Sequence, residues 1–408
     1  MIKITGNKLL YFIIIFFPIS TILQGFSAFN AINKLLMFAM FFLMIISFFT
    51  EKIEKSTYIY LVITIILTVF QTVYSGKGYY NFNMYIYFTL WCVFFLYLKH
   101  NFDEMITLIK NNVKLLTFIV RSWNILVFVS LFFKRSYVEN WGSTYFRSFS
   151  NAEHRFGSSC IVALTLAWML IQLTKKKKYY IYIILPMVGL LMCGARTYLA
   201  VGVIYLFAMY YMICPTEKFF YWTIIPIAVI TVVVILISPI GEKFISTFEG
   251  NGYYGYWATL TNGRNLFWAY DLQAFWELDW WHKLVGNGIN FVFQINAEKA
   301  GHAIWAHNDV INLLLTNGYI GTIMYFITFL GFSQKYIRRY AKGKFVLVFS
   351  YYFIWFFNAM FNMVYTYTCA VLVIPLMLYS LCIAEDKKLN RDLCLNDNTI
   401  NKCYNEIS

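Results

Sequence analysis

Repeated apolar runs constrain this chain more than any other feature of its sequence. Each approaches the ~20 residues that a helix needs to cross a membrane. They cover residues 9–26, 31–49, 57–74, 84–98, 115–133, 157–174, 179–194, 198–213, 220–239, 310–333, 345–361 and 365–383. The sequence therefore predicts an all-α polytopic membrane protein with about twelve transmembrane helices. The runs 179–194 and 198–213 are short enough to form a hairpin of tilted helices.

Composition supports this fold class. The chain is 60% hydrophobic and only 13% charged, whereas a soluble domain is about half apolar and about a quarter charged. The formal net charge of +14 could suggest nucleic acid as a partner. The basic residues, however, lie mostly in short connections between apolar runs, as the positive-inside rule describes. We therefore expect membrane lipid, and no nucleic acid, as a partner.

The distribution of basic residues also predicts the orientation. Connections such as Lys175 to Lys178 and the basic segment after residue 383 are rich in lysine or arginine, and such connections face the cytoplasm. Both termini are then inside. Residues 1–384 form the polytopic membrane domain, which includes one large folded extracytoplasmic loop at 240–309, and residues 385–408 form a cytoplasmic tail.

The large loop carries local signals of structure. Residues 265–280 have apolar residues at helical spacing, with Asn262 as the expected N-cap. Trp276, Trp280 and Trp281 suggest that this helix lies on the membrane surface. A turn at Gly286-Asn287-Gly288 follows. Residues 308–316 predict a short helix that Asn308 caps and Asn317-Gly318 ends.

Two arginines in this outer region are candidates for binding an anion. Arg196 lies between two apolar runs beside Gly194 and Ala195, and its planar fork suits a phosphate. Its alternative role is interfacial snorkelling. Arg264 opens the predicted surface helix, and a helix N-terminus with an arginine suits an anion. Its alternative role is that of an exposed loop charge.

His307 is the candidate for proton transfer. It immediately precedes the predicted helix at the outer face, beside Asn308 and Asp309. A neutral imidazole there could remove a proton near neutral pH, although a lone histidine is more often structural. Asn308 could orient the ring or cap the helix. Arg147 and His154, in the outer segment 134–156, are further candidates.

At these residues the chain resembles the O-antigen ligase and polymerase superfamily of bacterial envelope enzymes. Arg196 resembles the arginine that this family carries ahead of its large loop. The other matching segments are Phe146 to Asn151, Asn262 to Trp268, Gly286-Asn287-Gly288, and His307-Asn308 followed by Leu314, Gly318 and Gly321. The resemblance covers about residues 145–325.

The resemblance implies a Wzy-type O-antigen or capsule polymerase of the bacterial inner membrane. Its donor and acceptor would be oligosaccharides on undecaprenyl diphosphate, joined outside the cytoplasm without a metal or other cofactor. Arg196 and Arg264 would bind the donor diphosphate, His307 would be catalytic, and Asn308 and Arg147 would support them. A separate regulator of chain length would be a further partner.

Two other functions stay open at this point. One is an O-antigen ligase, which transfers glycan to lipid A core. The other is a transporter of lipid-linked glycan. Transporters place their polar groups near the membrane midplane in broken helices, whereas the candidate residues here cluster at the outer face.

Overall fold

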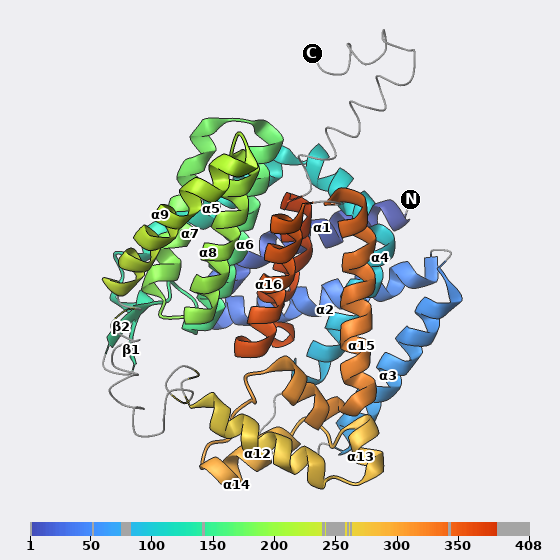
Figure 1. Ribbon diagram of the computed structural model, residues 1–408. Coiled ribbons are helices and arrows are strands. Elements are labelled where there is room, and N and C mark those ends of the chain that lie inside the picture. The colour runs from blue at the N-terminus through green and yellow to red at the C-terminus, as the bar shows by residue number, and fades with distance from the viewer. Residues whose placement is uncertain are drawn as a thin grey trace.

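The computed structural model describes residues 2–50, 53–74, 83–140, 143–238, 263–341 and 344–381, together with Gly241, Ala258 and Thr261. Almost all of these residues are helical (Figure 1). The helices of the N-terminal half are α1 (Ile2–Ile22), α2 (Ser27–Thr50), α3 (Lys55–Tyr74), α4 (Asn83–Asn111), α5 (Val113–Ser130), α6 (Glu153–Thr174), α7 (Ile181–Met192), α8 (Arg196–Ile213) and α9 (Glu217–Leu236).

The C-terminal half adds α12 (Arg264–Glu277), α13 (Trp280–Val285), α14 (Phe291–Ala300), α15 (Asp309–Tyr340), α16 (Phe345–Asn362) and a last apolar helix, Thr368–Leu381. Short 3-10 turns occur at η1 (Lys134–Ser136), η2 (Lys177–Tyr180) and η4 (Val364–Thr366). Strands β1 (Tyr137–Asn140) and β2 (Ser143–Phe146) form an antiparallel hairpin that pairs Tyr137 with Phe146.

The predicted membrane class is confirmed at a coarse level. Among the described residues, 8 helices are long and apolar enough to cross a membrane: α2, α3, α5, α6, α8, α9, α15 and α16. The segments Gly6–Ile22 and Thr368–Leu381 are shorter apolar helices. Helices also cover the two remaining predicted intervals, but α7 has only 12 residues and α4 continues to Asn111. The count of twelve crossings stays a prediction.

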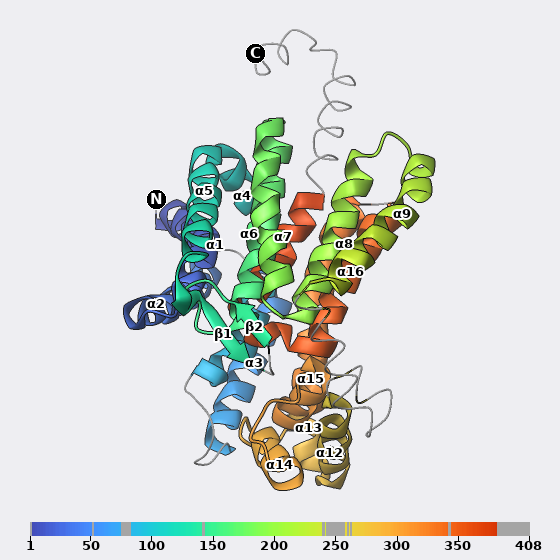
Figure 2. The same cartoon turned by 90° about the vertical axis from the view of Figure 1, so that its left-hand side faces the viewer.

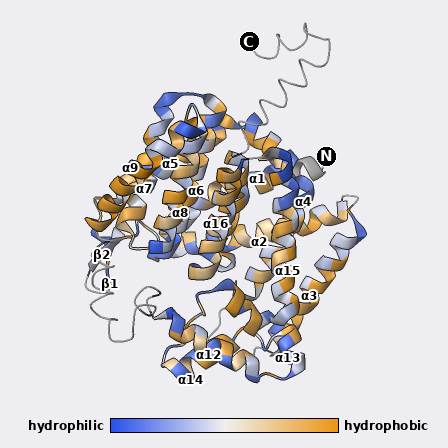
Figure 3. Ribbon diagram, viewed as in Figure 1, coloured by the Kyte–Doolittle hydropathy of each residue, from blue (hydrophilic) through white to orange (hydrophobic). Residues whose placement is uncertain are grey.

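Burial orders the bundle from centre to edge. Helix α6 is 94% buried over its apolar window, whereas α9 is only 6% buried. Ser, Cys, Ala and Gly in the first half of α6 let neighbouring helices approach closely, and α1, α7, α5 and α8 all contact it. Figure 3 shows apolar residues along the bundle helices and hydrophilic residues gathered toward their connections.

Helix α15 is held in the bundle by aromatic rings. Tyr325 stacks on Trp91 of α4, with ring centroids 4.4 Å apart. Phe329 stacks on Trp355 of α16 at 4.3 Å. Such pairs add directional packing to the burial of a large apolar area. They fix the long helix that starts at Asp309, two residues after His307.

Helices α12, α13 and α14, called the cap below, lie at one end of the bundle (Figures 1 and 2). The connection between α6 and α7, which carries Lys175 to Lys178, lies at the opposite end. The cap has its own small apolar core, in which Phe275, Val292 and Phe293 pack with Ile311 and Leu315 of α15. The described part of the loop 240–309 is therefore folded.

The helix predicted over 265–280 is shorter than expected. It ends at Glu277, and a new helix begins at Trp280. The cause is Asp279, whose side chain accepts a hydrogen bond from the His282 backbone N–H and caps α13. The expected cap Asn262 lies outside the described residues, and Gly263 occupies the N-cap position of α12. Trp276, Trp280 and Trp281 are all exposed.

Two glycine segments that are distant in the sequence contact each other. Gly286 and Gly318 both have positive φ, and an added Cβ at either would overlap the backbone of the other segment. The Asn287 backbone N–H donates to the Leu315 carbonyl at 2.9 Å. The predicted helix end at Gly318 is a kink, because α15 resumes beyond its non-helical residue. This contact joins the cap to α15.

Candidate functional site

The segment 301–308 connects the cap to α15 and carries His307. Trp268 of α12 donates its indole N–H to the Ala306 carbonyl at 2.7 Å, and Asn296 of α14 donates to the Ile304 carbonyl at 3.1 Å. Helices α12 and α14 of the cap thus fix the backbone on the N-terminal side of His307. The φ of His307 is 53°, an uncommon value for a residue other than glycine. Backbone strain of this kind concentrates at functional sites.

Asn308 begins α15 as predicted. Its side-chain oxygen accepts a hydrogen bond from the Ile311 backbone N–H at 3.1 Å, which confirms it as the N-cap. Its Nδ2 faces the Met360 sulfur of α16 at 3.7 Å. Asn308 is buried, so its observed contacts assign it a structural role beside His307.

Asp309 is the first residue of α15 and lies directly after Asn308. It is fully buried and accepts a hydrogen bond from the Tyr325 hydroxyl at 2.6 Å. Nearby, Asn312 of α15 donates a side-chain hydrogen bond to the Tyr365 hydroxyl of η4. Because η4 follows α16, the contact between Asn312 and Tyr365 joins the start of α15 to the turn that leads to Tyr367. The sequence prediction left Asp309 without a role.

Arg264 is the first residue of α12, directly after Gly263 in the left-handed region. Its Nη1 donates to the Phe361 carbonyl in the last turn of α16, where the helix dipole favours a cation. Burial, with a smaller contribution from Arg196, lowers the pKa of Arg264 to about 10. The guanidinium therefore stays charged at neutral pH, and its other N–H donors can serve a ligand.

Arg196 is the first residue of α8 and comes from the bundle rather than the cap. Gly194, with a φ of 67°, lies directly against the Tyr145 ring of β2, so a side chain there would overlap the ring. Arg196 lies within electrostatic range of both Tyr145 and Arg264. The β1–β2 hairpin and the start of α8 together place this arginine at the cap.

Arg196, Arg264 and His307 therefore converge from three elements. Arg264 acts electrostatically on His307 and is itself affected by Arg196. His154, from the start of α6, also acts on His307, and Tyr367 lies within range of Arg264. Arg196, Arg264, His154 and His307 thus lie together at the junction of cap and bundle, and each of these side chains is positively charged or can take up a proton.

The environment keeps the His307 imidazole neutral. Burial, followed by the positive charge of Arg264 and the proximity of His154, lowers its pKa to about 3. A neutral ring can accept a proton, but a base with so low a pKa is weak at neutral pH. An anion bound beside Arg264 would offset this field and raise the pKa of His307.

Arg147 is not part of this convergence in its described contacts. It lies directly after β2, where its Nη1 donates to the Asn151 carbonyl at 3.3 Å and its backbone N–H donates to the Ser136 carbonyl. These contacts shape the turn that leads into α6. A local structural role accounts for them.

His154 and Tyr367 are the two site residues whose role the sequence indicates least. His154 was one of two weaker candidates in a short outer segment, and Tyr367 is one of 33 tyrosines in an aromatic chain. Only the packing of α6 and η4 beside the cap brings His154 into electrostatic range of His307 and Tyr367 into range of Arg264. Among the described residues, no group of three or more His, Cys, Asp or Glu side chains could hold a metal ion.

Comparison with known proteins adds no relative. No protein-family model matches this chain, and no curated protein matches it significantly.

Proposed function

We propose that this chain is a polysaccharide polymerase of the O-antigen or capsule type. It would transfer a glycan from undecaprenyl diphosphate onto a lipid-linked repeat unit at the extracytoplasmic face of a bacterial inner membrane. The observation that carries the proposal is the convergence of Arg196, Arg264 and His307 beside the cap. Two arginines suit a diphosphate, and a histidine suits a hydroxyl that must lose its proton.

The reaction follows from these roles. The acceptor sugar hydroxyl gives its proton to a ring nitrogen of His307, and its oxygen attacks the anomeric carbon of the donor. The bond between that carbon and the diphosphate oxygen breaks. Arg196 and Arg264 stabilise the charge that develops on the departing lipid diphosphate, as fixed cations do in a site that excludes water.

The low pKa of His307 fits this order of events. Burial and the positive charge of Arg264 disfavour the imidazolium. Once a diphosphate lies between the arginines, their charge is compensated, and His307 becomes a stronger base. The histidine would thus gain basicity when the donor is bound, which links proton removal to the presence of the leaving group.

The test uses purified protein in nanodiscs with lipid-linked repeat units, and polymer ladders are followed on gels. The wild type should form long glycan. His307→Gln should lose ~10²–10⁴ in rate, because an amide cannot take the proton. Arg196→Lys and Arg264→Lys should each lose ~10²–10³, because lysine keeps the charge but not the fork. Normal ladders from both lysine variants would exclude bidentate diphosphate binding.

Two controls separate this proposal from its alternatives. Arg121→Lys changes an arginine of α5 whose described contact is the Tyr182 hydroxyl, and its ladders should be normal. Lipid A core offered as acceptor tests the ligase: product on that acceptor, with no ladder from repeat units alone, would replace polymerase by ligase. Movement of repeat units across the bilayer without a new glycosidic bond would indicate a transporter.

A further inference from the structure

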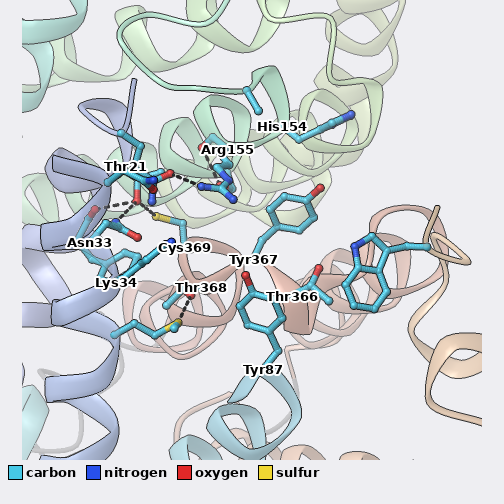
Figure 4. A pocket seen from close by; sticks show the side chains of 17 residues that line it. Thr21, Asn33, Lys34, Tyr87, His154, Arg155, Thr366, Tyr367, Thr368 and Cys369 are labelled. Carbon is cyan, nitrogen blue, oxygen red and sulfur yellow. Dashed lines mark hydrogen bonds between the residues drawn. The ribbon is translucent and has the colours of Figure 1, made fainter. Parts of the chain in front are cut away.

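A cavity of about 330 Å³ lies beside the candidate site, between α1, α2, the start of α6 and the segment that follows η4. This volume is at the small end of the range for ligand pockets, which is about 300–1,000 Å³. Figure 4 shows Thr21, Asn33 and Lys34 on one side of it, His154 and Arg155 on another, and the rings of Tyr87 and Tyr367 on a third. Trp305 of the segment 301–308 also lines it.

The charge on the cavity wall has one sign. Lys34, His154 and Arg155 line it, whereas no aspartate or glutamate does among the lining residues that the structure describes. Arg155 is half-buried and donates to the Gln24 side-chain oxygen at 2.8 Å. Within the described part of the chain, neither Lys34 nor Arg155 forms an ion pair. Two uncompensated cations at one cavity favour an anionic ligand.

The neutral part of the wall suits a carbohydrate. Amide side chains of Gln24, Asn30 and Asn33 and hydroxyl groups of Thr366 and Thr368 line it. These groups donate and accept hydrogen bonds, as sugar hydroxyls require. The rings of Tyr87, Tyr367 and Trp305 provide flat apolar surface. A small pocket with aromatic walls and a few polar groups that fix orientation is typical of a specific ligand site.

We propose that this cavity binds an anionic sugar of the substrate glycan, one that carries a carboxylate or a phosphate. Lys34 and Arg155 would bind the anionic group, and the amides and hydroxyls would bind the sugar hydroxyls. The inference rests on the proposed function, because it takes the ligand to be part of the glycan that is joined at His307.

The position of the cavity relative to His307 and Arg264 determines which sugar of the substrate can bind in it. Tyr367 lies within electrostatic range of both Arg155 and Arg264, and His154 lines the cavity while acting on His307. The cavity and the reacting centre therefore share a wall. The anion must belong to a sugar at or next to the new linkage. The diphosphate of the acceptor lies at the far end of its repeat unit and does not fit this place.

A binding experiment tests the cavity without any polymerisation. Full-length protein in nanodiscs is titrated with D-glucuronate, D-glucose 6-phosphate and D-glucose, and binding is followed by saturation-transfer NMR. At least one anionic sugar should bind, and glucose should bind roughly tenfold more weakly or not at all. Glucuronate binding alone indicates a sugar acid, and glucose 6-phosphate binding alone indicates a phosphorylated sugar.

Variants locate the binding. Arg155→Gln and Lys34→Gln should each weaken binding of the anionic sugar roughly tenfold, whereas Arg155→Lys should retain part of it. Lys178→Gln removes a charge at the opposite end of the bundle and should change nothing. Equal binding of glucose and the anions, no binding of either anion, or an equal loss in Lys178→Gln would overturn the proposal.

A second measurement separates this inference from the proposed function. Native lipid-linked repeat units, intact or with their carboxylates chemically reduced and their phosphates removed, are offered to the wild type and to Arg155→Gln. The wild type should show a higher KM for the neutralised units, and Arg155→Gln should no longer distinguish the two. If the wild type polymerises intact and neutralised repeat units equally well, the cavity assignment alone is wrong. If the wild type forms no polymer from any repeat unit, the proposed function is wrong. The NMR titration still tests whether the cavity binds an anionic sugar.

Discussion

At the scale of single residues, His307 combines three unusual properties. Its backbone lies in the left-handed region, its side chain is half-buried, and its pKa falls to about 3. A histidine kept only for packing needs none of them, and the strained backbone costs roughly 1–3 kcal/mol. The surrounding contacts from Trp268, Asn296 and Asn308 maintain that conformation.

The pKa of His307 gives a prediction that does not require turnover. Without ligand the imidazole should stay neutral from pH 8 to below pH 5, because burial and Arg264 oppose its protonation. Inorganic pyrophosphate should raise this pKa by compensating Arg264, and Arg264→Gln should raise it as well. Ring NMR signals, assigned by their loss in His307→Gln, measure the titration. An unchanged midpoint with saturating pyrophosphate would show that the anion binds elsewhere.

Sequence reasoning reached some of this site and missed the rest for a physical reason. Arg196, Arg264 and His307 were recognisable because each stands beside a local signal, a Gly-Ala step or a helix start. Arg155, Lys34 and Tyr367 have no such signal, since their proximity depends on how α1, α2, α6 and η4 pack. Arg147 carried a motif-like context, yet its observed contacts are those of a turn.

At the scale of elements, the helix positions were predictable and some of their ends were not. Apolar length predicts a helix wherever backbone groups must satisfy their hydrogen bonds within the segment, and a helix occupies most of each predicted interval among the described residues. The break at Asp279 escaped prediction because a tryptophan-rich helix pattern continues past it. The kink at Gly318 was read as a stop, since only packing on Gly286 lets the helix resume.

The contact between Gly286 and Gly318 predicts what one added methyl group at Gly318 would do. Gly318→Ala places a Cβ on the backbone of Leu284 and Gly286 at a positive φ, where the conformation alone costs roughly 1–3 kcal/mol. The variant should show a lower thermal midpoint and lose polymerisation, because the cap separates from α15. Gly331→Ala, in the same helix with open space around its Cβ, should keep both. Equal midpoints for the two variants would show that the contact does not hold the cap.

At the scale of the whole molecule, the two ends of the bundle differ in charge and in structure. One end carries Lys175 to Lys178, and the other carries the cap with its exposed tryptophans. Basic connections face the cytoplasm, and exposed indoles favour the interface. The proposed function requires the cap to be outside.

Reporter fusions measure this orientation directly. A fusion at Lys176 should show activity of a cytoplasmic reporter, because this connection carries four consecutive lysines. A fusion at Lys283, in α13, should instead activate a reporter that works only outside the cytoplasm. Cytoplasmic activity at Lys283 would reverse the orientation and remove the proposed catalytic role of His307 with it.

The junction between cap and bundle also sets an order in time. Arg196 enters the membrane early in synthesis, whereas Arg264, His307 and finally Tyr367 emerge from the ribosome progressively later. The turn η4, whose Tyr365 hydroxyl accepts a hydrogen bond from Asn312, is among the last segments made. A nascent or truncated chain therefore holds only fragments of the site. Under the proposed function, such a chain could not act on lipid-linked glycan until the last helices are inserted.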